Sequence, residues 1–135
     1  MNRGTLEAII VEGDAQATVE QAELLGKNLK ARGLKTNQIR NIFGTVRRIE
    51  MTWPEEPHDT AEQRQAQQAR RELILLKPKM AYQAKRASEV GPLAEVLTQG
   101  VDLVVAGSKD ERQRFQHFVD FFEAVLAYHK AHGGN

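Results

Sequence analysis

The stretch FQHFVDFFEAVLAYHK, residues 115 to 130, decides the fold class, because four of the chain's five phenylalanines fall between positions 115 and 122. Its core-type residues recur at intervals of three and four, as on one face of an α-helix, and they are Phe115, Phe118, Phe122, Val125 and His129. Phe121 and Tyr128 widen this face. We therefore expect a long helix, opened by a Ser108/Glu111 capping box and ending near His132, at the centre of the core or partly buried against another subunit.

Upstream of this stretch the helical period dominates, and no period-two strand pattern or internal repeat is visible. A helix is predicted from about residue 15 or 19 to residue 32, with Asp14 or Thr18 as its N-cap and Gly33 just after its end. Its expected apolar positions are Val19, Ala22, Leu25 and Leu29.

The next helix shows the clearest periodicity, carried by Ile39, Ile42, Phe43, Val46 and Ile49. Thr36 is its expected N-cap. The segment MTWPEEPHD, residues 51 to 59, has prolines at 54 and 57, so it ends this helix and forms a loop that Trp53 is expected to pin to the core.

A third helix is predicted to start near Asp59 or Thr60 with very polar first turns. Pro78 lacks the N–H that would bond back to the helix, so we expect either one bent helix or two helices with Pro78 in the first turn of the second. A fourth helix should cover residues 93 to 105, interrupted by Gly100. The predicted fold is all-α, a compact bundle of about five helices forming a single domain over residues 1–135.

Size and composition are those of one domain with its own core, at 135 residues and 15.2 kDa. The absence of cysteine excludes thiolate zinc sites and cysteine nucleophiles and suits a reducing compartment. The apolar run at residues 8–11 is too short for a secretion signal or a membrane span. We expect a cytoplasmic protein with no membrane partner.

Catalytic motifs are missing: the chain has no HExxH, no Ser-His-Asp signature with elbow glycines and no loop that could hold a phosphate. His129 and His132 are three residues apart, but no carboxylate lies near them on the helix, so His129 is expected in the core and no metal site or cofactor is predicted. Asp120 and Glu123 are expected on a solvated acidic face. The sequence predicts no enzyme, with a metal-dependent nuclease as a remaining alternative.

Charge is strongly segregated although the net charge is only +1. Residues 27–48 contain seven cations and no acid, and residues 64–86 contain seven cations and one acid, which leaves −12 for the rest of the chain. Two basic blocks would form a one-sided electrostatic surface if the fold brings them together.

Both basic blocks place cations in helical register. Arg40 and Arg47 are seven apart, on one flank of their helix, and Lys79, Tyr82 and Arg86 follow a spacing of three and four. Such a stripe suits RNA, where cations follow phosphates and a tyrosine can stack on a base. The alternative is that the cations are simply solvated and that Tyr82 covers the core with its ring.

Three segments together resemble the small subunit of the type III-A CRISPR effector, the Csm complex: TNQIRNIF at 36–43, LILLKPKMAYQAKR at 73–86, and the phenylalanine-rich helix at 115–130. The likeness covers about residues 36–130. It implies a small helical protein of antiviral defence that assembles in several copies along a filament, beside backbone and large subunits. In that family the small subunit is not the nuclease but lines the channel for target RNA. The matched polar residues are Thr36, Gln38, Arg40, Lys77, Lys79, Tyr82, Arg86, Tyr128, His129 and Lys130, and Lys85 adds charge.

The resulting hypothesis is a non-catalytic RNA-binding subunit that contacts guide RNA and single-stranded target RNA through phosphates. Sequence-specific readout is not expected, because asparagine and glutamine do not cluster with the arginines in the sequence. The predicted contact residues are Gln38, Arg40, Arg47, Lys77, Lys79, Tyr82, Lys85, Arg86 and Lys130. The hypothesis requires the two basic blocks to converge. The alternative is a helical adaptor that binds only protein.

Overall fold

The computed structural model describes residues 1–134, and every regular element in them is helical. The elements are α1 (Arg3–Ile10), α2 (Ala15–Ala31), α3 (Thr36–Thr52), α4 (Thr60–Arg86), the 3-10 turn η1 (Ser88–Val90), α5 (Gly91–Val105) and α6 (Glu111–Ala131). The all-α prediction is confirmed, with six α-helices in place of about five. The additional helix is α1, which at eight residues is too short for its period to stand out in the sequence.

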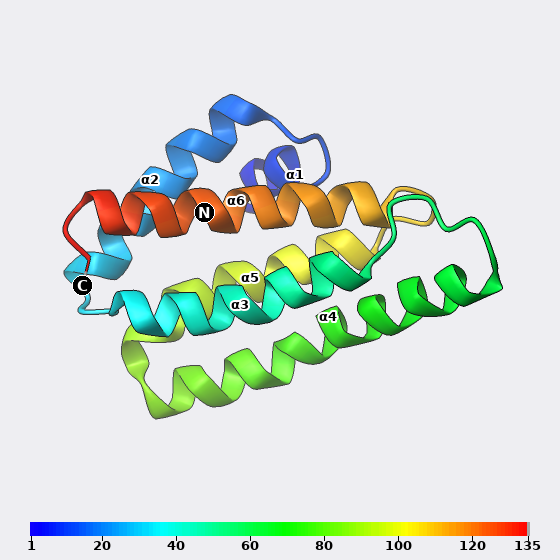
Figure 1. Cartoon of the computed structure of the whole chain (residues 1–135). Helices are drawn as coiled ribbons and strands as arrows, with labels where there is room; N and C mark the ends of the chain where they lie inside the picture. Colours follow the sequence, from blue (N-terminus) through cyan, green and yellow to red (C-terminus); the bar gives the residue numbers. More distant parts are fainter. Residues whose placement is uncertain (135) are drawn as a thin grey trace.

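Helix α6 is the central element, as its phenylalanines predict. It packs against α1, α2, α3 and α5, while α4 packs against α3 and α5 on the far side of those helices (Figure 1). Helices α3 and α4 run antiparallel, joined by the loop at residues 53–59 (Figure 1). The two basic blocks of the sequence therefore lie partly on neighbouring helices.

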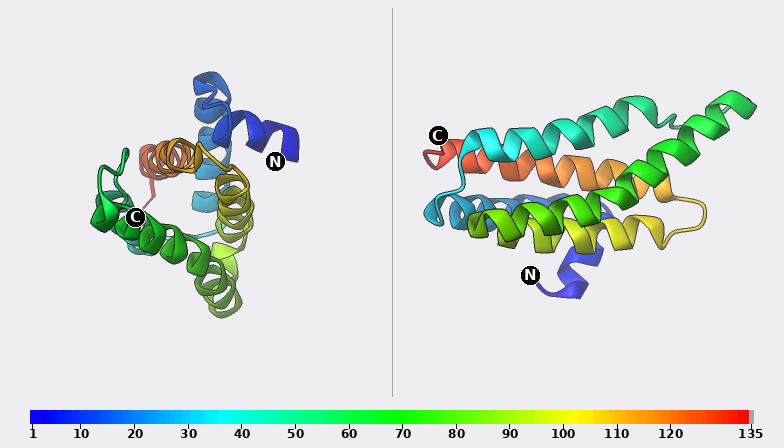
Figure 2. Two further views of the ribbon diagram at one scale, coloured as in Figure 1. Left: turned by 90° about the vertical axis from the view of Figure 1, so that its right-hand side faces the viewer. Right: turned by 90° about the horizontal axis from the view of Figure 1, so that it is seen from below.

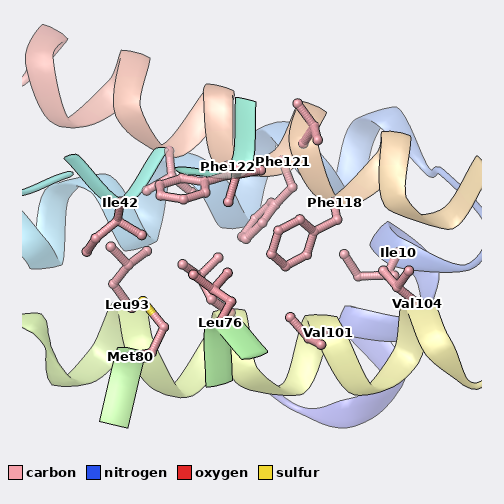
Figure 3. Close-up of a cluster of buried hydrophobic side chains, with 14 of the residues drawn as sticks. Ile10, Ile42, Leu76, Met80, Leu93, Val101, Val104, Phe118, Phe121 and Phe122 are labelled. Carbon is pink, nitrogen blue, oxygen red and sulfur yellow. The ribbon is translucent and has the colours of Figure 1, made fainter. Parts of the chain in front are cut away.

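The phenylalanines of α6 form the middle of the core, and Phe115, Phe118, Phe121 and Phe122 are each at most 1% exposed. Figure 3 shows three of them facing Leu76 and Met80 of α4 and Leu93 and Val101 of α5. His129 ends the same face with no exposed surface, and its Nε2 lies 2.6 Å from the Leu34 carbonyl oxygen, to which it donates. The expectation of a core histidine is confirmed.

Gly100 continues α5 where an interruption was expected, because it lies at a close contact between two helices. A Cβ on Gly100 would come within 2.9 Å of the Phe118 ring. A glycine at this position therefore lets α5 and α6 approach closely.

Helix α4 continues through Pro78, so the two-helix alternative is wrong. Pro78 is exposed, so the turn that lacks one helical hydrogen bond lies at the surface of α4 rather than in the core. The first turns of α4 extend past the body of the bundle (Figure 2), which explains why the sequence there is polar. Ala69 is the first buried residue of α4.

Helix caps differ in detail from the predictions. Asp14 caps α2 by accepting from the Ala17 N–H at 3.1 Å, and Gly33 follows α2 with a φ of 88°, as expected. Thr36 is not the N-cap of α3: it lies inside the helix, and the Gln38 amide oxygen accepts from the Lys35 N–H at 2.8 Å instead.

The expected Ser108/Glu111 capping box is also absent. Helix α6 begins at Glu111, and the Glu111 carboxylate accepts from Arg70 of α4 at 2.6 Å. Val19 is wrong as a core position, since it is 46% exposed, whereas the other three predicted apolar residues of α2 are buried. In the case of the capping box, a tertiary partner, Arg70, takes the Glu111 carboxylate that the box would need.

Trp53 anchors the loop after α3, as the sequence predicts. Its ring is 6% exposed and stacks on Phe115, with 4.9 Å between ring centroids. The Arg112 Nε donates to the Trp53 carbonyl at 3.0 Å. The loop end of the α3 and α4 pair is thereby fixed to α6.

Candidate nucleic-acid interface

A groove runs between α3 and α4 on the surface of the bundle, and we call it the α3/α4 groove. Its wide end has a volume of about 570 Å³ and is lined by Gln38, Asn41, Lys79, Tyr82, Gln83, Arg86, Ala87 and Val90. Its narrow end has a volume of about 390 Å³ and is lined by Thr45, Arg48, Ile49, Thr52, Glu72 and Lys79. Lys79 lines both ends, so the two hollows follow one another along the same pair of helices.

Helical period explains which side chains meet in this groove. Residues 38, 41, 45 and 48 of α3 are three and four apart, so they share one face. Lys79, Tyr82 and Arg86 do the same on α4, on the opposite side from the buried Met80, as predicted. Because the helices are antiparallel, Arg86 lies near the start of α3 and Lys79 near its middle.

The cations of the groove carry no ion pair within the described residues 1–134. Lys79 and Arg86 make no salt bridge there, and the Arg48 guanidinium only donates to the Thr45 hydroxyl, at 3.4 Å. Among the lining residues one is acidic, Glu72 at the narrow end, while the Glu89 carboxylate lies beside the wide end and is hydrogen-bonded to Gln38. Positive charge therefore prevails at the wide end.

Tyr82 is exposed, so the alternative in which its ring covers the core is wrong. Tyr82 is 63% exposed, and the guanidinium carbon of Arg86 lies 5.6 Å from the centroid of the Tyr82 ring. This distance is within the range of a cation–π interaction. Arg86 and Tyr82 thus form one unit at the wide end.

Gln38 lies in the groove, but both the oxygen and the nitrogen of its side-chain amide are already hydrogen-bonded within the protein. The oxygen accepts from the Lys35 N–H, and the nitrogen donates to the Glu89 carboxylate at 3.1 Å. This hydrogen bond holds the pKa of Glu89 below its ordinary value, with nearby backbone and Lys35 contributing. Gln38 therefore ties η1 to the start of α3.

Arg40 and Arg47 do not line the groove. Both lie more than about 100° around the α3 axis from the centre of the groove-lining face, given 3.6 residues per turn. The Arg47 guanidinium pairs with Glu50 at 2.6 Å and lies 6.0 Å from the Phe43 ring centroid, on the flank of α3 that meets α6. Their predicted convergence with Lys79 and Arg86 in one groove is not observed.

The remaining predicted cations also lie outside the groove. Lys77 turns to α5, where its Nζ lies 2.5 Å from the Asp102 carboxylate. Lys85 is exposed, and Lys130 near the end of α6 donates to the Gly134 carbonyl at 3.5 Å.

Sequence reasoning missed Arg48 and Asn41, which line the groove in place of Arg40 and Arg47. The signal was their spacing of three and ten residues from Gln38, which puts all three on one helical face. Asn41 and Gln83 also place amides beside Arg86, a cluster that the linear sequence does not show. Their side chains have no hydrogen-bond partner within residues 1–134.

Metal chemistry finds no support in the described part of the chain, where no three His, Asp or Glu side chains come together as ligands. Asp120 and Glu123 are exposed, as expected. No helix among residues 1–134 combines the length and the apolar character needed to cross a bilayer.

Comparison with known proteins gives one family. The family model described as Csm2 Type III-A matches residues 12–135, which extends the likeness beyond the three segments that first indicated it. No curated protein and no solved structure matches the chain. Because the match covers essentially the whole sequence, the chain belongs to the Csm2 family, the structural small subunit of the type III-A CRISPR complex.

Proposed function

We propose that the α3/α4 groove binds RNA through its phosphates, so that the subunit lines the target-RNA channel and stabilises guide–target pairing. One observation carries the proposal: Arg48, Lys79 and Arg86 come from two helices into one groove and are not neutralised there. Cations that hold the fold together are paired instead, as Lys77 is. Unpaired cations in a groove attract a polyanion.

Contacts to phosphates suit a subunit that must accept any target. Phosphates carry no sequence information, so Lys79 and Arg86 would hold RNA of every sequence equally. Specificity would come from pairing between guide and target. Three phosphate contacts give a slope of log affinity against log salt near −2 for a single strand.

Repetition along the complex would raise the affinity of each weak site. One groove offers few contacts, and several copies on one RNA add by avidity. We further propose that the partners are the other Csm subunits, guide RNA, target RNA and further copies of this chain, in the cytoplasm.

The test is charge reversal in the groove of the assembled complex. Lys79→Glu with Arg86→Glu removes two phosphate contacts, which at 50 mM salt lowers target-RNA affinity on the order of 50-fold. The matched control is Lys27→Glu with Lys30→Glu, which changes the net charge equally at exposed positions of α2 outside the groove.

Two outcomes separate the proposal from the adaptor alternative. If the groove variant assembles with its partners and binds target RNA as well as the wild-type complex does, the chain is a protein adaptor and the proposal is wrong. If both variants lose affinity equally, only the overall charge matters and the groove has no special role.

A further inference from the structure

Resting on the proposed function, we infer that the wide end of the groove holds one unpaired RNA base, stacked on the ring of Tyr82. Lys79 and Arg86 then contact the phosphates on either side. This inference adds a base-binding site to a groove so far described only by its charge.

The first argument is the exposure of Tyr82. Among residues 1–134, every other phenylalanine, tyrosine and tryptophan is buried or half-buried, whereas Tyr82 is 63% exposed in the groove. Arg86 lies over the ring, and the residue nevertheless keeps most of its surface exposed to a ligand. An exposed aromatic ring beside cations is the usual platform for a nucleic-acid base, since every base has a π-face.

The lining of the wide end has the chemistry of a base. Ala87 and the buried Val90 supply apolar surface, and Asn41 and Gln83 supply amides at the edge. A base is apolar on its faces and polar on its edges. Each amide offers both a donor and an acceptor and can rotate, so the pair can meet the edge of any base. The volume of about 570 Å³ is within the range of small-molecule sites.

Spacing along α4 agrees with a short stretch of RNA. Lys79 and Arg86 are seven residues apart, which is about 10.5 Å at 1.5 Å per residue. Stacked nucleotides advance about 3.4 Å each along one strand, so this span equals about three nucleotides. Tyr82 lies between the two cations and faces the middle nucleotide.

An unpaired base is required, because a duplex does not present a base face to the side. Bases within A-form RNA are stacked on their neighbours, and only the backbone and shallow minor groove are accessible. The site therefore prefers a single strand, or a nucleotide displaced from a duplex.

The experiment compares two probes of equal charge with the full-length protein: hexauridylate, and a hexamer of abasic ribose-type spacers. Wild-type protein should bind hexauridylate roughly tenfold more tightly than the abasic probe. Tyr82→Ala should remove this difference and leave binding of the abasic probe unchanged, while Tyr82→Phe should retain it. Tyr128→Phe is the control at the other tyrosine.

A second readout follows the ring directly. With fluorotyrosine incorporated, the chain gives two ¹⁹F resonances, because it contains two tyrosines. Hexauridylate should shift the Tyr82 resonance upfield through the ring current of a stacked base, and the abasic probe should not.

Equal binding of the two probes by wild-type protein would overturn the inference, as would a Tyr82→Ala variant that loses affinity for both probes alike. In those cases Lys79→Glu with Arg86→Glu would still weaken binding of both probes, and the proposed function would stand. If the charge variant also left both probes unaffected, RNA binding in this groove would be excluded altogether.

Discussion

The two flanks of α4 carry similar cations, which are ion-paired on one flank and unpaired on the other within residues 1–134. Toward α5 and α6, Arg70 pairs with Glu111 and Lys77 pairs with Asp102. Toward α3, Lys79 and Arg86 have no acidic partner within residues 1–134. Lys77 and Lys79 stand on either side of Pro78, yet one stabilises the fold and the other is available to a ligand. A basic stretch of sequence therefore has to be divided by helix face before it is interpreted.

The largest expected difference between the flanks is in RNA affinity. Arg48→Ala, Lys79→Ala or Arg86→Ala should each weaken binding about eightfold at 50 mM salt and reduce the salt slope by about 0.7, because each removes one phosphate contact. Arg47→Ala and Lys77→Ala should leave the slope unchanged. Fluorescence anisotropy of a labelled single strand across a salt series measures both quantities. Equal slopes for Lys77→Ala and Lys79→Ala would remove the distinction between the flanks.

A smaller effect is expected at the acid of the narrow end. Glu72→Gln should raise RNA affinity about threefold at low salt, because it removes a negative charge beside Lys79 worth less than about 1 kcal/mol when exposed. Glu95→Gln on the exposed surface of α5 is the matched control. No gain for Glu72→Gln relative to this control would show that RNA does not reach the narrow end.

The paired flank should respond in stability rather than in binding. Lys77→Ala and Asp102→Ala should each lower the free energy of unfolding by about 0.5 kcal/mol, since the two side chains are 36% and 48% exposed and such pairs are weak. Urea unfolding followed by the fluorescence of Trp53, the single tryptophan, measures this. A double-mutant cycle should give a coupling of about 0.2 to 1 kcal/mol. Zero coupling would mean that Lys77 and Asp102 do not stabilise the fold as a pair, so the ion pair would not set this flank apart from the other.

The smallest effect concerns Glu89, next to the wide end. The pKa of Glu89 is lowered in the folded protein mainly by the hydrogen bond from the Gln38 amide. The ionised carboxylate therefore stabilises the fold at pH values above the ordinary glutamate pKa of about 4.3. That contribution should disappear as the pH falls from there through the lower folded pKa. Urea midpoints of wild type and Glu89→Gln should therefore differ at neutral pH and converge in acid. A difference between the two urea midpoints that persists at the lowest pH would indicate that Glu89 affects stability other than through the charge of its carboxylate.

Much of the fold followed from periodicity. The buried apolar positions of α3, and those of α6 except Val119, were predicted residue by residue, because a strongly amphipathic helix can bury only one face. Exact caps were less predictable: Thr36 and Ser108 have the right side chains, but Gln38 and Arg70 offered the competing hydrogen bonds. The effect of Pro78 on α4 was ambiguous, because the free-energy cost of a proline within a helix depends on whether the disrupted turn is exposed to solvent.

The candidate site was predicted only in part. The stripe of Lys79, Tyr82 and Arg86 was correct as a surface of α4, since it depends on the spacing within one helix. Arg40 and Arg47 were chosen as its partners, whereas Arg48 lies across the groove. The spacing within α3 groups Arg48 with Gln38 on one face, but only the packing of the helices decides that this face, and not the one with the two predicted arginines, lies toward α4.

The amino-acid sequence by itself determined that the chain is a helical bundle, which residues form most of its core and which family it resembles, because these depend on local spacing. Only the tertiary structure decided which cations are neutralised and which remain available. Ion pairs such as that of Lys77 with Asp102 join residues 25 positions apart, and only packing of the helices brings such charges together.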